Sequence, residues 1–177
     1  MSMALPIPEM TTGGCLCGGV RFQINFAPDH DWKRGPHTCQ CTQCRKNSGC
    51  LIYSFHTVKL SELTWHSRST YSEYNSSPRA CRAFCKNCGS PLGWIDRENA
   101  TEIELAVGCF DEEFLIGGRD GEDRSLGASG LALANPEGDH FHVRNEIKGV
   151  TDEISVKGTR FWKGSKEGPI SKDKPTH

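Results

Sequence analysis

Apolar and polar positions alternate along several segments of this chain. In VRFQINF every second residue from Val20 to Phe26 is apolar, which is the pattern of a strand with one buried face. TEIELAVGCF has the same period through Ile103, Leu105 and Val107. LIYSFHTVKL, LTWHS and TYSEY are rich in β-branched and aromatic residues and are further predicted strands. The pattern predicts many short strands and little helix.

The remaining segments are polar and rich in turn-forming residues. We assign residues 1–12 to a flexible N-terminal arm and residues 163–177 to a mobile C-terminal tail. Residues 111–140 include GGRDGEDRSLGASG and NPEGDH, which predict a long surface loop or insertion with at most one short helix. HFHVRNEI is predicted to return as a last strand. The expected fold is mainly β, a single domain of short antiparallel strands with long loops over residues 13–162.

Length and charge narrow the classes of protein that fit. A chain of 177 residues is long enough for one domain with a real core and short for two. A net charge of -1 argues against a nucleic-acid-binding surface, which is normally basic. No segment approaches the roughly 18 apolar residues of a membrane-spanning helix. The first residues lack the charged and apolar regions of a signal peptide, so we expect a cytoplasmic, reducing location.

Ten cysteines are the strongest chemical signal in the sequence. In a reducing compartment, clustered cysteines bind metal or perform chemistry more often than they form disulfides. Seven of the ten fall in three tight groups, which are Cys15/Cys17, Cys39/Cys41/Cys44 and Cys85/Cys88. The clustering predicts metal sites.

Two cysteine pairs together match a closed zinc site. Tetrahedral zinc with Zn–S bonds near 2.3 Å needs sulfur atoms about 3.8 Å apart, so the chain must bend at each pair. Glycines flank Cys15 and Cys17, and Gly89 follows Cys88, which allows the backbone angles of tight turns. Cys15, Cys17, Cys85 and Cys88 therefore form a candidate tetrathiolate with a structural role.

The remaining group, CQCTQC, supplies three ligands from Cys39, Cys41 and Cys44. Three protein ligands and one exchangeable position are the arrangement of catalytic zinc, and the open position accepts water or a substrate thiol. A second zinc ion per chain is therefore expected. A closed site is equally compatible with the sequence, because another side chain can fold back as the fourth ligand. The candidates are His37, His56, Cys50, Cys81 and Cys109.

Alternatives exist for the other cysteines as well. A different partition joins Cys15 and Cys17 to the trio, but it leaves a five-plus-two split that suits tetrahedral metal poorly. We expect Cys50, Cys81 and Cys109 to be small buried apolar side chains, as free cysteines commonly are. Cys81 lies four residues before Cys85, so a redox role near the structural site is the alternative.

The order of the motifs resembles one family. G-C-L-C-G-G-V-R-F from Gly14, C-Q-C-T-Q-C-R-K-N-S-G from Cys39 and R-A-F-C-K-N-C-G-S-P-L from Arg82 are similar to the glutathione-dependent formaldehyde-activating enzymes, whose domain also occurs in centromere protein V. The resemblance spans residues 14–92. It departs from many members at Gln40, where they have histidine, and residues 111–140 match no motif of the family.

The resemblance implies a zinc-binding β fold of the tent type and a division of labour between the sites. Cys15, Cys17, Cys85 and Cys88 match the family's structural zinc ligands, and Cys39, Cys41 and Cys44 match its catalytic zinc ligands. The implied activity is carbon–sulfur bond chemistry, the joining of glutathione and formaldehyde or the reverse lyase reaction. Arg45 and Lys46 are candidates to attract the carboxylates of glutathione.

These residues suggest one enzymatic mechanism and two alternative functions. A substrate thiol binds at the trio, loses its proton and attacks an aldehyde, while His37 or His56 relays a proton to the new alkoxide. The first rival is a non-catalytic, zinc-stabilised module that binds a protein partner. The second is a zinc enzyme that uses Lewis acidity on another small molecule. The sequence does not define the substrate or the oligomeric state.

Overall fold

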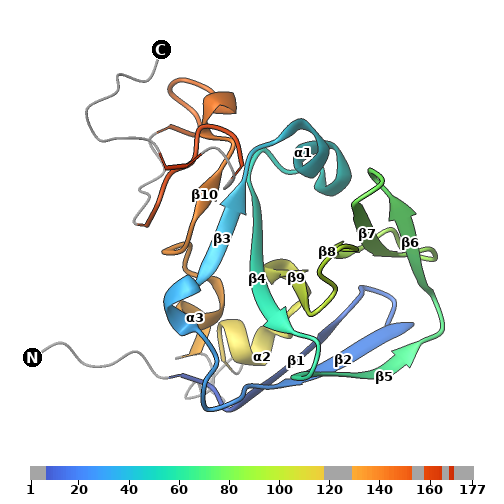
Figure 1. The fold of residues 1–177 in the computed structure, drawn as a ribbon. Coiled ribbons are helices and arrows are strands. Elements are labelled where there is room, and N and C mark those ends of the chain that lie inside the picture. The colour runs from blue at the N-terminus through green and yellow to red at the C-terminus, as the bar shows by residue number, and fades with distance from the viewer. Residues whose placement is uncertain (1–6, 118–128, 153–157, 165–167, 170–177) are drawn as a thin grey trace, which may run out of the picture.

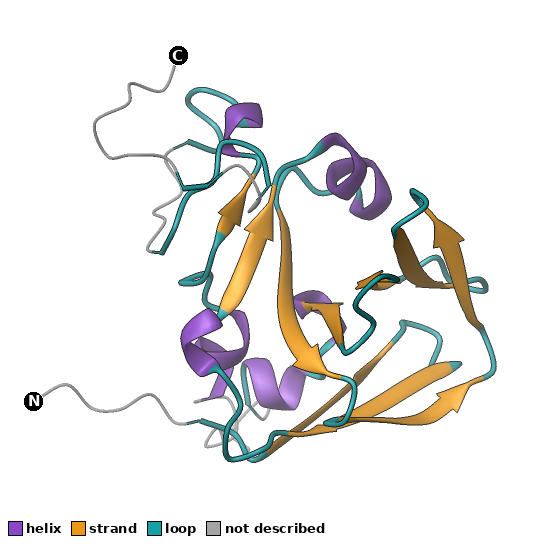
Figure 2. Cartoon of the chain, in the orientation of Figure 1, coloured by secondary structure: helices purple, strands orange, loops and turns teal. Residues whose placement is uncertain are grey.

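The computed structural model describes residues 7–117, 129–152, 158–164 and 168–169. Its strands are β1 (Met10–Gly14), β2 (Val20–Asn25), β3 (Pro36–Cys39), β4 (Tyr53–Lys59), β5 (Leu63–Arg68), β6 (Tyr71–Asn75), β7 (Ala80–Cys85), β8 (Pro91–Asp96), β9 (Glu102–Ala106) and β10 (His140–Phe141). Its helices are short, namely η1 (Trp32–Arg34), α1 (Thr42–Ser48), η2 (Val107–Cys109), α2 (Glu112–Leu115), α3 (Gly130–Ala134) and η4 (Val143–Asn145). The expected mainly β fold is confirmed (Figures 1 and 2).

The strands form two sheets. One has three strands in the order β1-β2-β5, and the other has seven in the order β10-β3-β4-β9-β8-β7-β6. All neighbours are antiparallel except β10 and β3, which run parallel. In Figure 1 the three-stranded sheet lies across the lower edge of the molecule, and β3 and β4 rise steeply above it. The two sheets therefore meet at a large angle.

One face of the seven-stranded sheet makes the core. Residues that pair across an antiparallel ladder lie on the same face, so the pairs Val58–Ile103 and His56–Leu105 define this face. All four side chains are at most 1% exposed. The other sheet contributes Phe22 of β2 to the core. The ring of Phe22 makes edge-to-face contacts with the rings of Trp65 and Phe110. The alternation that predicted β2 and β9 thus identified their core-facing residues.

The opposite face of the same sheet carries polar and reactive side chains. The ladder pairs Cys39 with Tyr53 and Phe55 with Ala106 on this face. Further along the sheet, Trp94 pairs with both Glu104 and Arg82. Because strand side chains alternate between faces, the apolar core pattern forces these residues to the other side.

Three sequence-based boundaries need correction. β1 begins at Met10 and its Thr11 is fully buried, so the domain includes residues that we had assigned to the arm at 1–12. The segment 111–140 is not only a surface loop: it carries two short helices, and Phe114 and Leu133 are buried. The last predicted strand is only two residues long. For the first two, the reason is that long-range contacts stabilise segments whose local pattern is weak.

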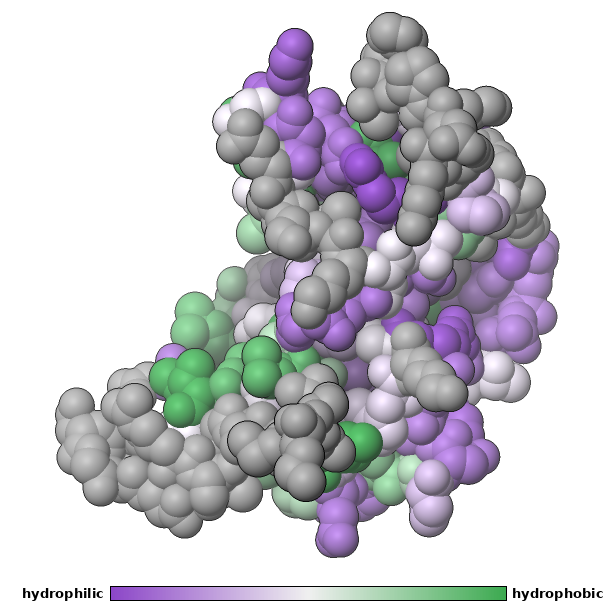
Figure 3. Space-filling model, turned by 90° about the vertical axis from the view of Figure 1, so that its left-hand side faces the viewer, coloured by the Kyte–Doolittle hydropathy of each residue, from purple (hydrophilic) through white to green (hydrophobic). Residues whose placement is uncertain are grey.

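Some predictions fall on parts that the structure does not describe, including residues 118–128 and most of the proposed tail at 163–177. In the described ranges, no helix is long and apolar enough to cross a membrane. Ile116 and Leu131, near α2 and in α3, are exposed apolar side chains. The face in Figure 3 carries its apolar surface mainly in its lower part.

A buried chain of polar groups lies between the two sheets. Nδ1 of His30 is 2.9 Å from the carboxylate of Glu62, which also accepts the backbone N–H groups of Ala27 and Lys59. Nε2 of His30 lies 3.2 Å from Nε2 of His56. Two ring nitrogens that face each other share a single proton. Burial, together with the neighbouring His30, lowers the pKa of His56 to about 3.

This pKa predicts acid sensitivity of the fold. A histidine whose folded pKa lies below its unfolded value of about 6.5 contributes stability above pH 6.5, and this stability is lost as the pH falls toward the folded pKa. The unfolding free energy of the wild type should fall by roughly 1 kcal/mol per pH unit below pH 6.5 on account of His56. Urea unfolding from pH 7.5 to 5 measures this slope, and His56→Gln should have a shallower one.

The matched control is His66→Gln, which alters an exposed histidine on β5. It should keep the wild-type slope. An identical pH dependence in the wild type and the His56→Gln variant would contradict this account of His56.

Candidate metal centres and active site

Four cysteines from two distant turns meet beside the end of the core. Cys15 and Cys17 lie in the turn between β1 and β2, and Cys85 and Cys88 lie at the turn between β7 and β8. The Sγ atoms of Cys15 and Cys17 are 3.6 Å apart, and those of Cys17 and Cys85 are 3.7 Å apart. These separations match the roughly 3.8 Å edge of a zinc tetrathiolate. The group can hold a metal ion.

Two tight turns bring these sulfur atoms together. Gly18 and Gly89 each follow the second cysteine of a pair, with φ of +74° and +76°. Such angles strain any residue with a side chain, which explains the glycine at each place. Backbone N–H groups point at the sulfurs: that of Val20 donates to Cys15 at 3.2 Å, and that of Cys88 donates to Cys85 at 3.5 Å. Donors of this kind favour thiolates over thiols.

The cysteine trio lies at the junction of β3 and α1. Cys39 ends β3, Cys41 is the N-cap residue of α1, and Cys44 lies in its first turn. The backbone N–H of Cys44 donates to the sulfur of Cys41 at 3.2 Å. The three sulfur atoms lie within 4.8 Å of one another, so the trio can hold a second metal ion. The sequence did not predict α1, whose N-cap is Cys41 of the trio.

The three thiols interact strongly in their buried position. The hydrogen bond with Cys39 lowers the pKa of Cys41, and the same interaction with Cys41 raises the pKa of Cys39. One thiolate thus hinders ionisation of the next, because like charges in a poorly solvated site repel. A divalent cation relieves this conflict, since it stabilises all three thiolates together. The donor set therefore fits a metal ion.

The candidates for a fourth protein ligand do not join the trio. Nδ1 of His37 accepts the backbone N–H of Asp139 at 2.8 Å, and His56 lies on the core face against His30. Among the described residues, the metal-competent group at this place contains only the three cysteines. The five suggested fourth ligands, His37, His56, Cys50, Cys81 and Cys109, are all absent from it. The closed-site alternative is thus wrong for these side chains.

The three isolated cysteines lie in different surroundings. Cys81 is fully buried, with its sulfur 3.7 Å from the carboxylate of Glu73, and Cys109 is buried against the backbone oxygen of Pro91. Both match the expected buried role. Cys50 is exposed, and this part of the prediction is wrong: it follows α1, which ends at Ser48 with Gly49 as its C-cap.

The trio opens on a cavity of about 350 Å³ whose floor is the polar face of the seven-stranded sheet. Apolar rings from Tyr53, Phe55, Trp94 and Phe141 form much of its lining. Among the groups that complete it are Arg82, Glu104 and His142. The candidate relays His37 and His56 are not among the lining residues. The cavity is large enough for a small aldehyde and the thiol end of a peptide.

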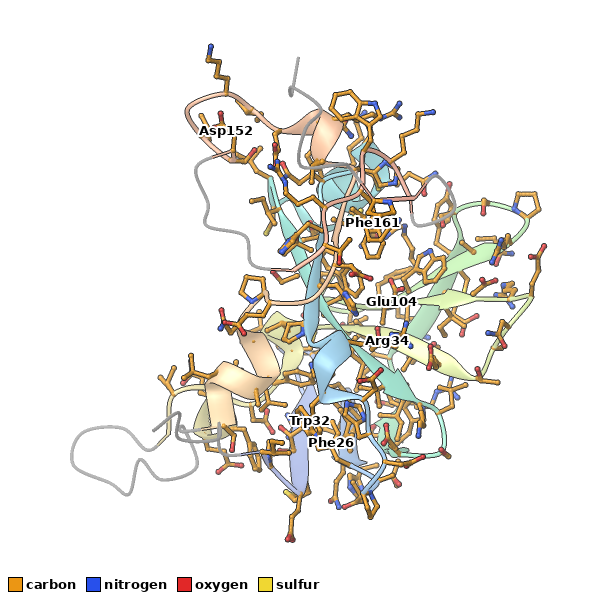
Figure 4. All side chains as sticks on the ribbon, turned by 60° about the vertical axis from the view of Figure 1, so that its left-hand side comes forward. Phe26, Trp32, Arg34, Glu104, Asp152 and Phe161 are labelled. Atoms are coloured by element: carbon orange, nitrogen blue, oxygen red, sulfur yellow. The ribbon has the colours of Figure 1, made fainter. Side chains whose placement is uncertain are left out.

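A buried arginine and a partly buried glutamate line this cavity. Arg82 is 5% exposed, and its Nη2 donates to the sulfur of Cys44 at 3.5 Å and to Gln43 at 3.4 Å. Its buried Nε has no partner. Burial raises the pKa of Glu104 to about 8. In the view of Figure 4, Glu104 lies between Arg34 and Phe161.

His142 is the third polar group that the sequence analysis missed. It has φ of +58°, a left-handed conformation that is uncommon for a residue with a side chain, and its buried Nδ1 has no hydrogen-bond partner. Strained residues gather at functional sites, but the segment HFHVRNEI gives no hint of strain. The sequence does contain a signal for the other two polar groups, Arg82 and Glu104. Arg82 opens the motif RAFC, and Glu104 is the polar residue between two core positions of a strand.

Arg45 and Lys46, the predicted carboxylate-binding pair, lie in α1 and have different surroundings. Lys46 lines a second cavity of about 340 Å³, which shares Gln43 and Arg82 with the first. Arg45 lines neither cavity. Residues 45 and 46 point in directions about 100° apart around a helix, so only one of their side chains faces the second cavity.

Two comparisons relate this chain to known proteins. A solved crystal structure of a Rhodobacter sphaeroides protein, a structural genomics target, has 22% sequence identity to this chain with a TM-score of 0.47. The match covers 57% of this chain and 88% of that one. The sequence pattern of the glutathione-dependent formaldehyde-activating enzymes matches residues 10–120, which is more than half of the chain and includes all seven clustered cysteines. The chain therefore belongs to the family of glutathione-dependent formaldehyde-activating enzymes.

Proposed function

We propose that this protein is a zinc-dependent enzyme that forms or cleaves the carbon–sulfur bond between a glutathione-like thiol and an aldehyde. The observation that carries the proposal is a buried trio of cysteines that opens on a cavity without a fourth protein ligand among its described neighbours. Catalytic zinc sites keep such a position open, whereas structural sites close it. Family membership supports glutathione and formaldehyde as the substrates.

The two clusters have different proposed roles. Cys15, Cys17, Cys85 and Cys88 would hold a structural zinc ion, because four sulfurs complete its tetrahedron. Cys39, Cys41 and Cys44 would hold a catalytic zinc ion. A zinc ion held by three thiolates supplies Lewis acidity that lowers the pKa of a bound thiol, so that a thiolate nucleophile exists at neutral pH.

The protein groups around the trio prepare the site for this chemistry. The guanidinium of Arg82 donates to the sulfur of Cys44 and so offsets part of the negative charge of three thiolates. The rings of Tyr53 and Phe55 restrict access of water, which strengthens electrostatic interactions inside the cavity. These residues hold the thiol and the aldehyde close together and away from solvent.

Lys46 is the better candidate of the predicted pair for binding a glutathione carboxylate. It lines the cavity that adjoins the trio, so a tripeptide whose thiol points at the trio can extend toward it. Arg79 also lies nearby, but it is paired with Asp96 through Nε at 3.0 Å and attracts another carboxylate less strongly.

The first test combines metal content and turnover in Cys44→Ser. We expect the variant to remain folded by circular dichroism, to lose one of two zinc ions per chain, and to lose catalysed exchange between glutathione and formaldehyde. Exchange NMR at equilibrium measures this rate. Work below the pKa of the thiol suppresses the uncatalysed reaction, because the thiolate is the nucleophile.

Cys50→Ser is the matched control, because Cys50 is exposed and outside both clusters. It should retain both zinc ions and full activity. Global unfolding of Cys44→Ser would instead assign the trio a structural role, and a wild type without catalysed exchange would refute the proposed reaction.

The second test separates the two basic residues of α1. Lys46→Gln should raise KM for glutathione about two- to fivefold and leave kcat unchanged, since an exposed ion pair contributes about 0.2–1 kcal/mol. Arg45→Gln should leave both constants unchanged. Steady-state kinetics with varied glutathione measures the effect, and an equal rise of KM in both variants would contradict the assignment to Lys46.

A further inference from the structure

The carboxyl group of Glu104 lies in the cavity onto which the trio opens, and the sequence analysis gave it no role. We propose that Glu104 is the catalytic acid–base residue, which donates a proton to the carbonyl oxygen when the thiolate adds and removes it in the reverse reaction. The proposal rests on the proposed function, because it specifies the proton transfer of the same reaction.

Sheet geometry places Glu104 on the same face of the sheet as Cys39 of the trio. In β9 its neighbours Ile103 and Leu105 fill the core, so Glu104 must face the other side of the sheet. Cys39 of the trio lies on the same side, because it pairs with Tyr53, which shares its face with Phe55. Trp94 and Arg82 continue this face beyond Glu104. An aldehyde in the cavity therefore has sulfur ligands toward one end and a carboxyl group on the floor.

The surroundings of Glu104 keep its carboxyl group protonated near neutral pH. The strongest effect is burial, which disfavours the charged carboxylate and raises its pKa. Arg34 of η1 and Arg82 of β7 act in the opposite direction, and Glu102 of β9 and Asp96 of β8 add to the rise. Tyr53 of β4 also faces Glu104 electrostatically, and its own pKa is raised by burial. A pKa of about 8 leaves most of the carboxyl groups able to donate a proton at pH 7.

Arg82 does not remove this proton, because its guanidinium is directed elsewhere. Its Nη2 donates to Gln43 and to Cys44, so the arginine mainly compensates the sulfur cluster. The arginine and the glutamic acid of this cavity therefore do not form an ion pair with each other. This separation allows a neutral glutamic acid beside a cationic arginine.

The step balances without any further reactant. The thiolate sulfur attacks the carbonyl carbon, a carbon–sulfur bond forms, and the carbonyl π pair moves to oxygen. The oxygen takes the proton of Glu104, which gives a neutral hemithioacetal and a carboxylate. The carboxylate then takes up from solvent one proton, which replaces the proton that the thiol released when it became a thiolate. In the reverse direction it removes the hydroxyl proton, the carbonyl re-forms, and the carbon–sulfur bond breaks.

The two histidines that the sequence suggested are less suited to this transfer. His37 and His56, the relays suggested by the sequence, do not line the cavity. His56 faces the core, and Nδ1 of His37 already accepts a backbone N–H. Within the described lining, Glu104 is the carboxylic acid of the cavity.

The test compares Glu104→Gln with Glu102→Gln. Glutamine keeps the shape and hydrogen bonding of Glu104 but cannot transfer a proton. We expect Glu104→Gln to lower kcat for thiol–aldehyde exchange at least about 100-fold, within the usual range for removal of a general acid. KM for glutathione and the zinc content should stay close to wild type. Glu102→Gln alters a carboxylate on the same strand face that pairs with Arg34 outside the cavity, and it should retain activity.

Two further readouts exclude a merely structural role. The activity of the wild type should decline as the pH rises through about 8. Glu102→Gln should show the same decline at a somewhat lower pH, because Glu102 adds to the rise of the Glu104 pKa, and Glu104→Gln should lack the decline. Infrared difference spectra at pH 7 should show a protonated carboxyl band in the wild type and in Glu102→Gln, and this band should be missing in Glu104→Gln.

Each outcome is decisive. Activity of Glu104→Gln within about threefold of wild type, or a band that Glu104→Gln retains, would overturn the role of Glu104 while the proposed function stands. A wild type without catalysed exchange would overturn the proposed function and this inference with it.

Discussion

The repulsion between neighbouring thiolates is the constraint on which this structure depends. Seven cysteine sulfurs are gathered into two clusters, with separations as short as 3.6 Å in the closed one. Thiolates so close together are unfavourable unless a cation compensates them. Two turns of the four-cysteine cluster also need glycine, because their positive φ would strain a residue with a side chain. A metal ion bound by the four cysteines would add its binding free energy to folding and would join the first strand to β7, some 70 residues later.

The seven-stranded sheet divides the remaining tasks between its two faces. The face with Ile103 and Leu105 packs on the smaller sheet and stabilises the fold. The face with Cys39, Arg82 and Glu104 lines the cavity beside the trio. Since strand side chains alternate, each core residue fixes the position of a site residue next to it. Strands of the sheet therefore hold most of the site residues in place. Helix α1 contributes the sulfur atoms of Cys41 and Cys44.

Local sequence patterns predicted those features that depend on local rules. Alternation identified β2 and β9, and a composition rich in β-branched and aromatic residues identified β4. The spacing of C-x-C and C-x-x-C with adjacent glycines identified the turns that hold four sulfurs. Helix α1 escaped prediction because it has no apolar period and buries only Cys44. It forms because Cys41 caps its first turn and Gly49 ends it in a left-handed conformation. The trio was found, but its helical setting was not.

The cavity groups were missed for a different reason. A glutamate between two apolar strand positions indicates a solvent-facing side chain, and Glu104 fits that pattern until other segments enclose its face. Phe141 and His142 reach the same cavity from the parallel pairing of β10 with β3, which joins residues about 100 positions apart. Such long-range pairing has no local signature, so the sequence could suggest His37 and His56 but not His142.

The vacancy beside Cys39, Cys41 and Cys44 is the central claim, and X-ray absorption at the zinc edge tests it most directly. In the protein alone, the average number of sulfur ligands per zinc should lie between three and four, because one site is closed by four cysteines and the other holds three. Addition of glutathione should raise this average to four as the substrate thiol joins the trio. An average that does not change with glutathione, or that already equals four without it, would contradict the account.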